Sequence, residues 1–290
     1  MARIVKDRTK TRLGREIEAA LISLNDQHAF FLFLEYQFFE QLRALSPTSA
    51  EHFTTVAFPG NRYASKIHVR LRDLPSFGEA HRSVTFGAYF TTSYEVASGF
   101  TDKALEMLRN FSRTPLHLPP RRREGPEQFY QRALASWALK MPASQLIDTL
   151  SFMRYRRNSL VHLNEAPTRP YETLASQSGR LLNTFWMKAR PSVDFTIPET
   201  KPLAERETLD LLKLLRIVIQ RLDTHFASVI DERGLVRVEA ARLFGGQRVR
   251  MNRYVMEQRM QILRTEIVRN YGLSPRESEL KTAVQEVGTR

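Results

Sequence analysis

Apolar residues recur every three or four positions along most of this 290-residue chain. That spacing places them on one face of an α-helix, and it constrains the fold more than any other feature. In residues 203–231 the apolar stripe consists of Leu209, Leu212, Leu215, Val218, Ile219, Leu222 and Phe226. We therefore expect an all-α protein, long enough for one large domain or two small ones.

The formal net charge of the chain is +13. Such an excess favours a polyanionic partner, most simply RNA or DNA, although an acidic protein would also suit it. The chain has no cysteine, which excludes disulfides, thiolate zinc sites and cysteine nucleophiles and fits a reducing cytoplasm. Residues 1–15 are basic but lack an apolar signal core, and no apolar run is long enough to span a membrane.

The first part of the chain predicts a helix over residues 11–24 and a second over 26–45, separated by Asn25 and Asp26. Apolar residues nearly surround the second helix: Phe30, Phe31, Phe33, Leu34, Tyr36, Phe38, Phe39 and Leu42. A helix that is apolar on all sides is typical of a protein core, so we expect a central core helix. The alternative is an aromatic platform on which nucleic-acid bases stack.

Helical periodicity fades over residues 51–75, where two short β-prone runs flank Pro59 and Gly60. This pattern favours a small β-hairpin inserted into the helical fold. Ser76 then predicts a capping box and a helix over 77–97, and Gly99 predicts an interruption before a further helix at 101–111.

Proline-rich linkers at 115–126 and 190–202 separate further helices at 126–139, 143–164, 171–188 and 203–231. The first linker carries Arg121, Arg122 and Arg123, which would either contact phosphates or form a solvated loop. We expect a helical domain over 1–232 and a basic helical C-terminal extension over 233–290.

The extension predicts a helix to Phe244, a break at Gly245 and Gly246, a helix ended by Gly272, and a last short helix. Its arginines favour contacts with nucleic-acid phosphates: Arg248, Arg250, Arg253, Arg259 and Arg264. The rival interpretation is a packing or dimerisation element, which the apolar stripe Met256, Met260, Leu263 and Ile267 supports.

The most informative pattern is Arg157-Asn158 followed by Leu160-Val161-His162, near the end of the helix expected at 143–164. At 100° per residue, one stripe of that helix carries Arg154, Asn158, His162 and Glu165. Arg157 lies about 140° from His162 and points toward the apolar side, where an unpaired guanidinium is costly. It therefore needs a carboxylate, a phosphate or a cleft between two bundles.

This phrase resembles the Arg-Asn-x-x-x-His signature of the HEPN family, and the resemblance covers about the middle third of the chain. The resemblance implies a helical bundle, no metal or other cofactor, and a homodimer in which each chain supplies an Arg and a His to a shared cleft. It also implies a metal-independent ribonuclease that acts in the bacterial cytoplasm as a toxin or antiviral defence effector, with an antitoxin or defence-system protein as partner.

The chemistry expected at this site is acid–base cleavage of RNA. Imidazole can gain or lose a proton near neutral pH, so His162 can take a proton from the ribose 2′-hydroxyl or give one to the leaving 5′-oxygen. Arg157 can bind the scissile phosphate, and Asn158 can orient the ring or the phosphate. Arg154 and Arg156 are expected to bind the substrate.

Two other classes of function stay open from the sequence. One is a helical module without catalysis that binds nucleic acid or a protein, and the other is a DNA-binding regulator that uses the C-terminal extension. A structural role is also open for the signature itself, because a helix-borne arginine often pairs with a carboxylate and a histidine near a helix end often bonds a carbonyl.

Overall fold

In the computed structural model, every regular element of the described residues (10–44, 47–162, 166–189, 191–247 and 250–288) is helical. This confirms the expected all-α fold. The α-helices are, in chain order, α1 (Arg12–Arg43), α2 (Thr54–Ala57), α3 (Ala64–Ile67), α4 (Leu74–Phe111), α5 (Pro126–Ser136), α6 (Ser144–Val161), α7 (Arg169–Trp186), α8 (Glu205–Val229), α9 (Glu232–Phe244), α10 (Arg253–Tyr271) and α11 (Glu277–Gly288).

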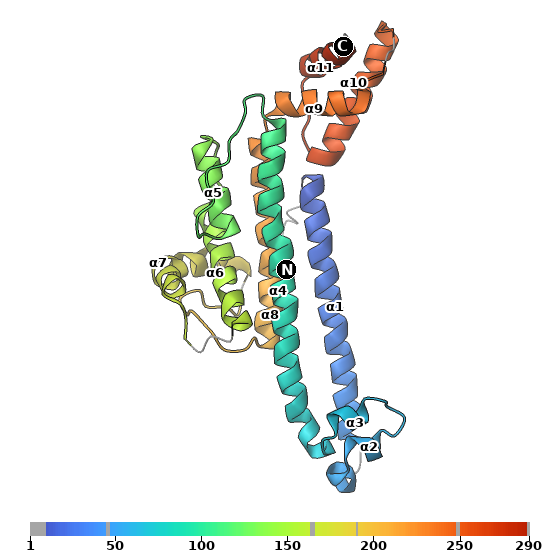
Figure 1. Cartoon of the computed structure of the whole chain (residues 1–290), viewed down its shortest axis with the longest axis vertical. Coiled ribbons are helices and arrows are strands. Elements are labelled where there is room, and N and C mark those ends of the chain that lie inside the picture. Colours follow the sequence, from blue (N-terminus) through green and yellow to red (C-terminus); the bar gives the residue numbers. More distant parts are fainter. Residues whose placement is uncertain (1–9, 45–46, 163–165, 190, 248–249, 289–290) are drawn as a thin grey trace.

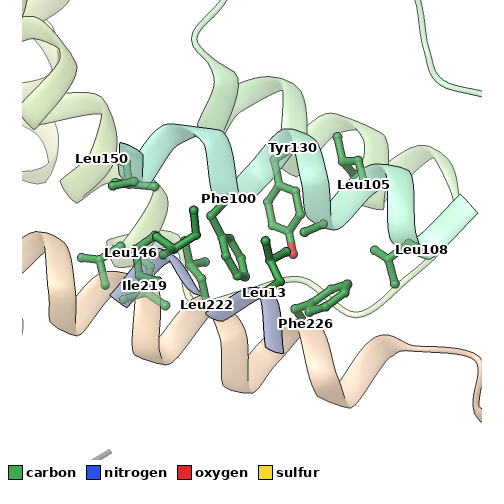
Figure 2. Close-up of a cluster of buried hydrophobic side chains, with 14 of the residues drawn as sticks. Leu13, Phe100, Leu105, Leu108, Tyr130, Leu146, Leu150, Ile219, Leu222 and Phe226 are labelled. Carbon is green, nitrogen blue, oxygen red and sulfur yellow. The ribbon is translucent and has the colours of Figure 1, made fainter. Parts of the chain in front are cut away.

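The long helices α1, α4 and α8 pack against one another and form the axis of the molecule (Figure 1). Helices α5 and α6 lie on the side of α4 that faces away from α1, and α7 packs on α6. Figure 2 shows a part of the core to which α1, α4, α5, α6 and α8 contribute, where Phe100, Leu146 and Leu222 are among the buried residues.

Both of the helix breaks expected in the first hundred residues are absent. Helix α1 continues through Asn25 and Asp26, and α4 continues through Gly99. A glycine inside a helix costs about 1 kcal/mol, and asparagine or aspartate costs less. Burial of the neighbouring Ala97 and Phe100 in the core outweighs that cost. Ser76 is not an N-cap, because α4 begins at Leu74.

The β-hairpin expected at 51–75 is also wrong. The described residues there form α2, α3 and two short 3-10 turns, and their only β feature is a single antiparallel bridge between Phe53 and Arg70. The buried hydroxyl of Thr54 donates a hydrogen bond to the Ala64 carbonyl at 2.9 Å, which ties α2 to the start of α3. This packing within the segment overrides the β propensity of its two runs.

The C-terminal helices follow the expected pattern closely. Helix α9 ends at Phe244, before Gly245, and α10 ends at Gly272, whose φ of 64° is the left-handed conformation that glycine favours. Helix α9 packs on α4, and α10 packs on α1. Leu235 belongs to the same hydrophobic core as Phe226, so the extension shares its packing with the rest of the chain.

An aspartate of α8 fixes the start of α1. The buried Asp223 carboxylate accepts hydrogen bonds from the backbone N–H groups of Lys10 and Thr11 and from the Thr11 hydroxyl. Thr11 in turn accepts a hydrogen bond from the Gly14 N–H at 3.1 Å and caps the helix. Gly14 has no Cβ, which leaves room for the carboxylate.

The second half of α1 is not a core helix. Leu32 is buried and Phe31 packs against the core, but Phe30, Phe33 and Leu34 are 61%, 57% and 50% exposed. Helix α8 begins only at Glu205, whose carboxylate accepts a hydrogen bond from Tyr36. Phe30, Phe33 and Leu34 share the outer face of α1 with the exposed Ser23 and Gln27, and this face points away from α4 and α8. Past the start of α8, α1 and α4 continue as a pair (Figure 1).

His28 is the most unusual buried group between α1 and α4. Its ring is fully buried against Phe86 and Tyr89, at centroid distances of 5.1 and 5.2 Å. Neither ring nitrogen has a hydrogen-bond partner among the described residues. Burial lowers the pKa of His28, and the charge of Glu205 opposes this shift only in part.

This lowered pKa predicts a loss of stability in acid. Unfolded histidine titrates near pH 6.5, so below that pH the unfolded chain binds a proton that folded His28 resists. The free energy of unfolding should therefore fall from about pH 7 to about pH 5. His28→Leu should raise the free energy of unfolding by about 1–3 kcal/mol, because two unpaired nitrogens disappear.

Urea unfolding of both proteins across this pH range measures the effect. His225 also has a pKa lowered by burial, but it contributes equally to the wild type and the variant. An equally steep loss of stability in both proteins would contradict the role assigned to His28.

Candidate functional site at the end of helix α6

Helix α6 carries the signature and lies among four other helices. It packs against α4, α5, α7 and α8, and it begins at Ser144, close to the expected start. Its buried face includes Leu146, Leu150 and Met153. The helix ends at Val161, and the backbone N–H of His162 donates the last hydrogen bond to the Asn158 carbonyl at 3.0 Å. The end of the helix thus sets the position of His162.

The ring of His162 is exposed, and no hydrogen bond to it occurs among the described residues. It lies one helical turn beyond Asn158, which is half-buried. Glu165, expected on the same stripe, lies outside the described residues. His162 is therefore accessible to a substrate from solvent.

Arg157 finds its anion within the same chain. Its guanidinium forms an ion pair with the carboxylate of Glu95 on α4 and donates a hydrogen bond to the Asn158 side-chain oxygen at 2.9 Å. It also lies over the ring of Tyr94, 5.4 Å from the ring centroid. Its Nε is buried without a hydrogen-bond partner among the described residues. The sequence correctly predicted that Arg157 needs an anion, but it did not indicate Glu95.

This pairing removes the reason for expecting a shared cleft between two chains. A cleft between two chains is one way to give Arg157 an anion on an apolar face. Glu95 provides that anion within the same chain. The dimer with two signature helices near its axis therefore stays a prediction from the resemblance alone.

Arg156, which was expected to bind the substrate, is enclosed within the bundle. Its side chain is 1% exposed and pairs with Glu207 of α8 through two hydrogen bonds of 2.9 and 3.2 Å. A third hydrogen bond reaches the Glu199 carbonyl at 3.2 Å. A guanidinium that is enclosed and held by three hydrogen bonds cannot reach an RNA phosphate without opening the bundle.

Arg154 is also drawn into the protein. It pairs with the buried carboxylate of Glu127 on α5 at 2.9 Å. Ser151 donates a hydrogen bond of 2.8 Å to the same carboxylate, and the Tyr94 hydroxyl donates a longer one of 3.4 Å. Burial, with the Glu127 charge, raises the pKa of Tyr94, so its phenol stays protonated as a donor.

Three arginines of the last turns of α6, one of them in the signature, thus bind carboxylates on three different helices. Arg154 is joined to α5, Arg156 to α8 and Arg157 to α4. Only the Arg157 pair involves a carboxylate whose side chain is more than half exposed, at 53%. Arg157 is therefore the one of the three that an external phosphate can approach.

A groove of about 800 Å³ adjoins the end of α6. One wall is α4, including Val84 and Thr91, and the other is Leu160 and Val161 of α6 with the loop at Lys201. The groove is mainly apolar, with Lys201 as its cation. It offers space for a substrate beside the last turn of α6.

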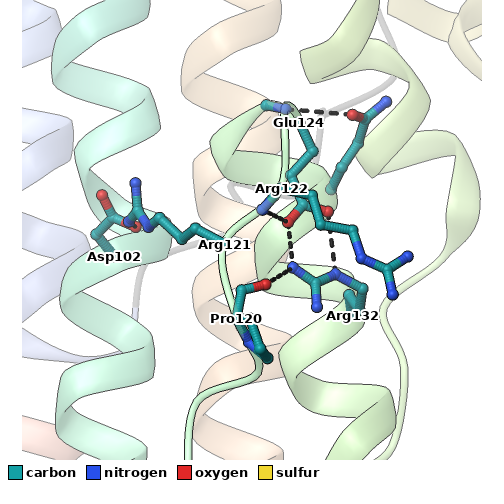
Figure 3. Close-up of polar contacts among 8 residues, drawn as sticks. Asp102, Pro120, Arg121, Arg122, Glu124 and Arg132 are labelled. Carbon is teal, nitrogen blue, oxygen red and sulfur yellow. Dashed lines mark hydrogen bonds and ion pairs between the residues drawn. The ribbon is translucent and has the colours of Figure 1, made fainter.

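The arginines of the first linker are partly engaged. Arg121 pairs with Asp102 of α4 at 2.9 Å (Figure 3). It also lies over the ring of Phe129. Glu124 accepts hydrogen bonds from the Arg122 backbone and from Arg132, and Arg132 also bonds the Pro120 carbonyl. These contacts hold the linker against α4 and α5, whereas the exposed Arg121 and Arg122 still face solvent.

The structure of the C-terminal extension favours a role in packing over a role in binding nucleic acid. Met260, Leu263 and Ile267 are buried, as is Arg259, which lies over the ring of Phe244. Arg253 is exposed but pairs with Glu257 one turn away. Arg248 lies outside the described residues. A surface for nucleic acid on this helix is therefore smaller than the sequence predicts.

In the part of the chain that the structure describes, no group of three or more His, Asp or Glu side chains is placed to hold a metal ion. None of the helices in this part is long and apolar enough to cross a membrane. No protein-family model, curated protein or solved structure matches the chain. The function of the chain is therefore inferred from the residues at the end of α6.

Proposed function

We propose that the chain is a metal-independent endoribonuclease of the HEPN type, with its site at the end of α6. One observation carries the proposal: Arg157 holds an anion, the Glu95 carboxylate, near the surface, and the same helix end carries an exposed histidine. A phosphodiester is an anion that can take the place of that carboxylate.

The chemistry follows from the two side chains. His162 takes the proton of the ribose 2′-hydroxyl as the 2′-oxygen attacks phosphorus. The bond from phosphorus to the 5′-oxygen breaks, and the 5′-oxygen receives a proton from water, which the exposed site admits. Arg157 stabilises the charge that builds on the phosphoryl oxygens, and Asn158 holds the guanidinium in place. The products are a 2′,3′-cyclic phosphate and a 5′-hydroxyl.

Glu95 competes for Arg157 only weakly. The two side chains are 53% and 24% exposed, and ion pairs this open to solvent contribute about 1 kcal/mol or less. Substrate binding can therefore displace Glu95 at small cost. The excess positive charge of the chain further favours RNA over its own carboxylate.

Incubation of the protein with single-stranded RNA in EDTA tests the proposal. We expect cleavage that persists in the chelator, with products ending in 2′,3′-cyclic phosphate, because the reaction needs a 2′-hydroxyl and no metal. DNA of the same sequence should stay intact. Binding of RNA without cleavage, at saturating protein, would instead favour the helical binding module.

That module is the second candidate, and a specific observation favours it. Arg154, Arg156 and Arg157 each join α6 to another helix, which is a role that needs no catalysis. Under either candidate, action as a bacterial toxin or defence effector in the cytoplasm, controlled by an antitoxin or defence-system protein, remains an implication of the family resemblance.

A further inference from the structure

The outer face of the second half of α1 is an aromatic surface that no other described part of the chain covers. We call it the α1 stripe and define it as Phe30, Phe33 and Leu34, three side chains that are half exposed or more. Tyr36 and Phe38 are also exposed and border it. These positions, at i, i+3 and i+4, share one face of the helix, roughly opposite the face that buries Leu32 and His28.

The stripe is large for a monomer surface. With about 200 Å² for a fully exposed aromatic side chain, the exposed fractions of the stripe and its two bordering rings correspond to about 500 Å². That matches the largest apolar patches on single chains, which are often functional. Uncharged residues on either side of the stripe, such as Gln27 and Gln37, extend the surface. A standard interface buries about 800 Å² on each partner.

The charges on α1 argue against nucleic acid as the ligand of the stripe. Stacking of bases on aromatic side chains is normally accompanied by cations that bind the backbone. From position 16 to position 42 the chain has no lysine or arginine. The charged residues in that range are all acidic: Glu16, Glu18, Asp26, Glu35 and Glu40. An aromatic platform for nucleic-acid bases at this place therefore lacks the positive charge that RNA binding needs.

We propose that the α1 stripe binds the same stripe of a second copy of this chain, with the two helices antiparallel. Interface cores are rich in aromatic side chains and poor in charge, and residues 27–39 contain one charged residue, Glu35, which turns inward to pair with Arg82. A two-fold contact of this kind is self-complementary, which is the common arrangement in homodimers.

One antiparallel register brings the apolar groups together. With Phe30 opposite Phe33 of the other copy, Arg43 comes level with Ala20. At 100° per residue Arg43 points away from the stripe, and it pairs with Glu40 of its own helix, so it does not oppose a charge of the other copy.

The acidic residues nearest the stripe meet neutral partners in this register. Asp26 comes opposite Gln37, and Glu40 comes opposite Ser23. No two like charges are opposed, although the chain as a whole is strongly basic. The same contact would cover a helix pair that otherwise projects beyond α8 with one face uncovered (Figure 1).

This dimer differs from the shared-cleft dimer that the family resemblance implies. Helix α6 lies on the side of α4 that faces away from α1, so each copy keeps its own His162 and Arg157 (Figure 1). The inference therefore stands independently of the proposed ribonuclease activity.

Light scattering of the full-length protein at micromolar concentration tests the oligomeric state. We expect a dimer, and we expect the double substitution Phe30→Glu/Phe33→Glu to weaken dimerisation about 100-fold or more, because each change occurs twice in a two-fold interface. Both residues are exposed, so the variant should keep its circular-dichroism spectrum and its unfolding temperature. The matched control Leu181→Glu changes an equally exposed apolar residue on α7 and should stay dimeric.

A cross-link tests the orientation of the two helices. The chain has no cysteine, so the double variant Asp26→Cys/Gln37→Cys contains only the two introduced thiols. They lie about 16 Å apart along one helix and cannot bond within a chain. In the antiparallel dimer each meets its counterpart, and mild oxidation should give a covalent dimer. A wild-type protein that stays monomeric, or a dimer that resists the double glutamate substitution, would overturn the proposal and leave the stripe to a different protein.

Discussion

His162→Ala should lower the rate of RNA cleavage by about 10²–10⁴-fold while the protein stays folded. Loss of a group that transfers protons usually costs this much. The ring is exposed and makes no hydrogen bond among the described residues, so its removal should not change the unfolding temperature. Cleavage of a labelled RNA under single-turnover conditions measures the rate of the chemical step.

The neighbouring variants separate the roles of the site. Arg157→Ala should lose activity to a similar extent, and Arg157→Lys should recover only part of it, because lysine keeps the charge without the planar fork. Asn158→Ala should have a milder effect. His117→Ala, at an exposed histidine of the first linker, is the matched control and should cleave at the wild-type rate. Wild-type cleavage by His162→Ala would remove the catalytic assignment.

Arg156→Met should lower the free energy of unfolding by about 3–5 kcal/mol. The substitution leaves the Glu207 carboxylate without its main partner in a largely buried position. Removal of one member of a buried ion pair typically has this cost, because the remaining charge is neither solvated nor paired. Urea or thermal unfolding measures the change.

Two comparisons make this prediction specific. Arg156→Met/Glu207→Met removes both charges and should recover most of the stability, as replacement of a buried pair by apolar side chains is often neutral. Arg157→Met breaks the adjacent but more exposed pair with Glu95 and should cost about 1 kcal/mol or less. Similar losses for Arg156→Met and Arg157→Met would show that burial does not distinguish the two ion pairs.

Much of the fold could be predicted because helix formation depends largely on residues that are close together in the sequence. The apolar stripe of α8, the start of α6 near Ser144 and the glycine that ends α10 each depend on residues within a few turns. The same local pattern placed Arg157, Asn158 and His162 at one helix end. It also indicated that the Arg157 guanidinium must find an anion.

Whether a helix ends at a residue of low helix propensity depends on the packing of the helix in the core and not on that residue alone. Asn25 and Gly99 weaken a helix by about 1 kcal/mol or less, and packing of α1 and α4 against α8 outweighs this. The short β-prone runs before α4 likewise formed helical turns once Thr54 was bonded to Ala64. Propensity is a small energy, and tertiary contacts reverse it easily.

The sequence by itself determined that the chain is helical and that one helix end carries an arginine, an asparagine and a histidine. Only the tertiary structure decided which anion each arginine meets: Glu95 lies 62 residues before Arg157, and Glu207 lies 51 residues after Arg156. It also decided that Leu32 is covered while Phe30 and Phe33 are not, although all three are apolar. The physical reason is that periodicity fixes the face on which a side chain lies, whereas the packing of α4 and α8 against α1 fixes which of its faces have a neighbour.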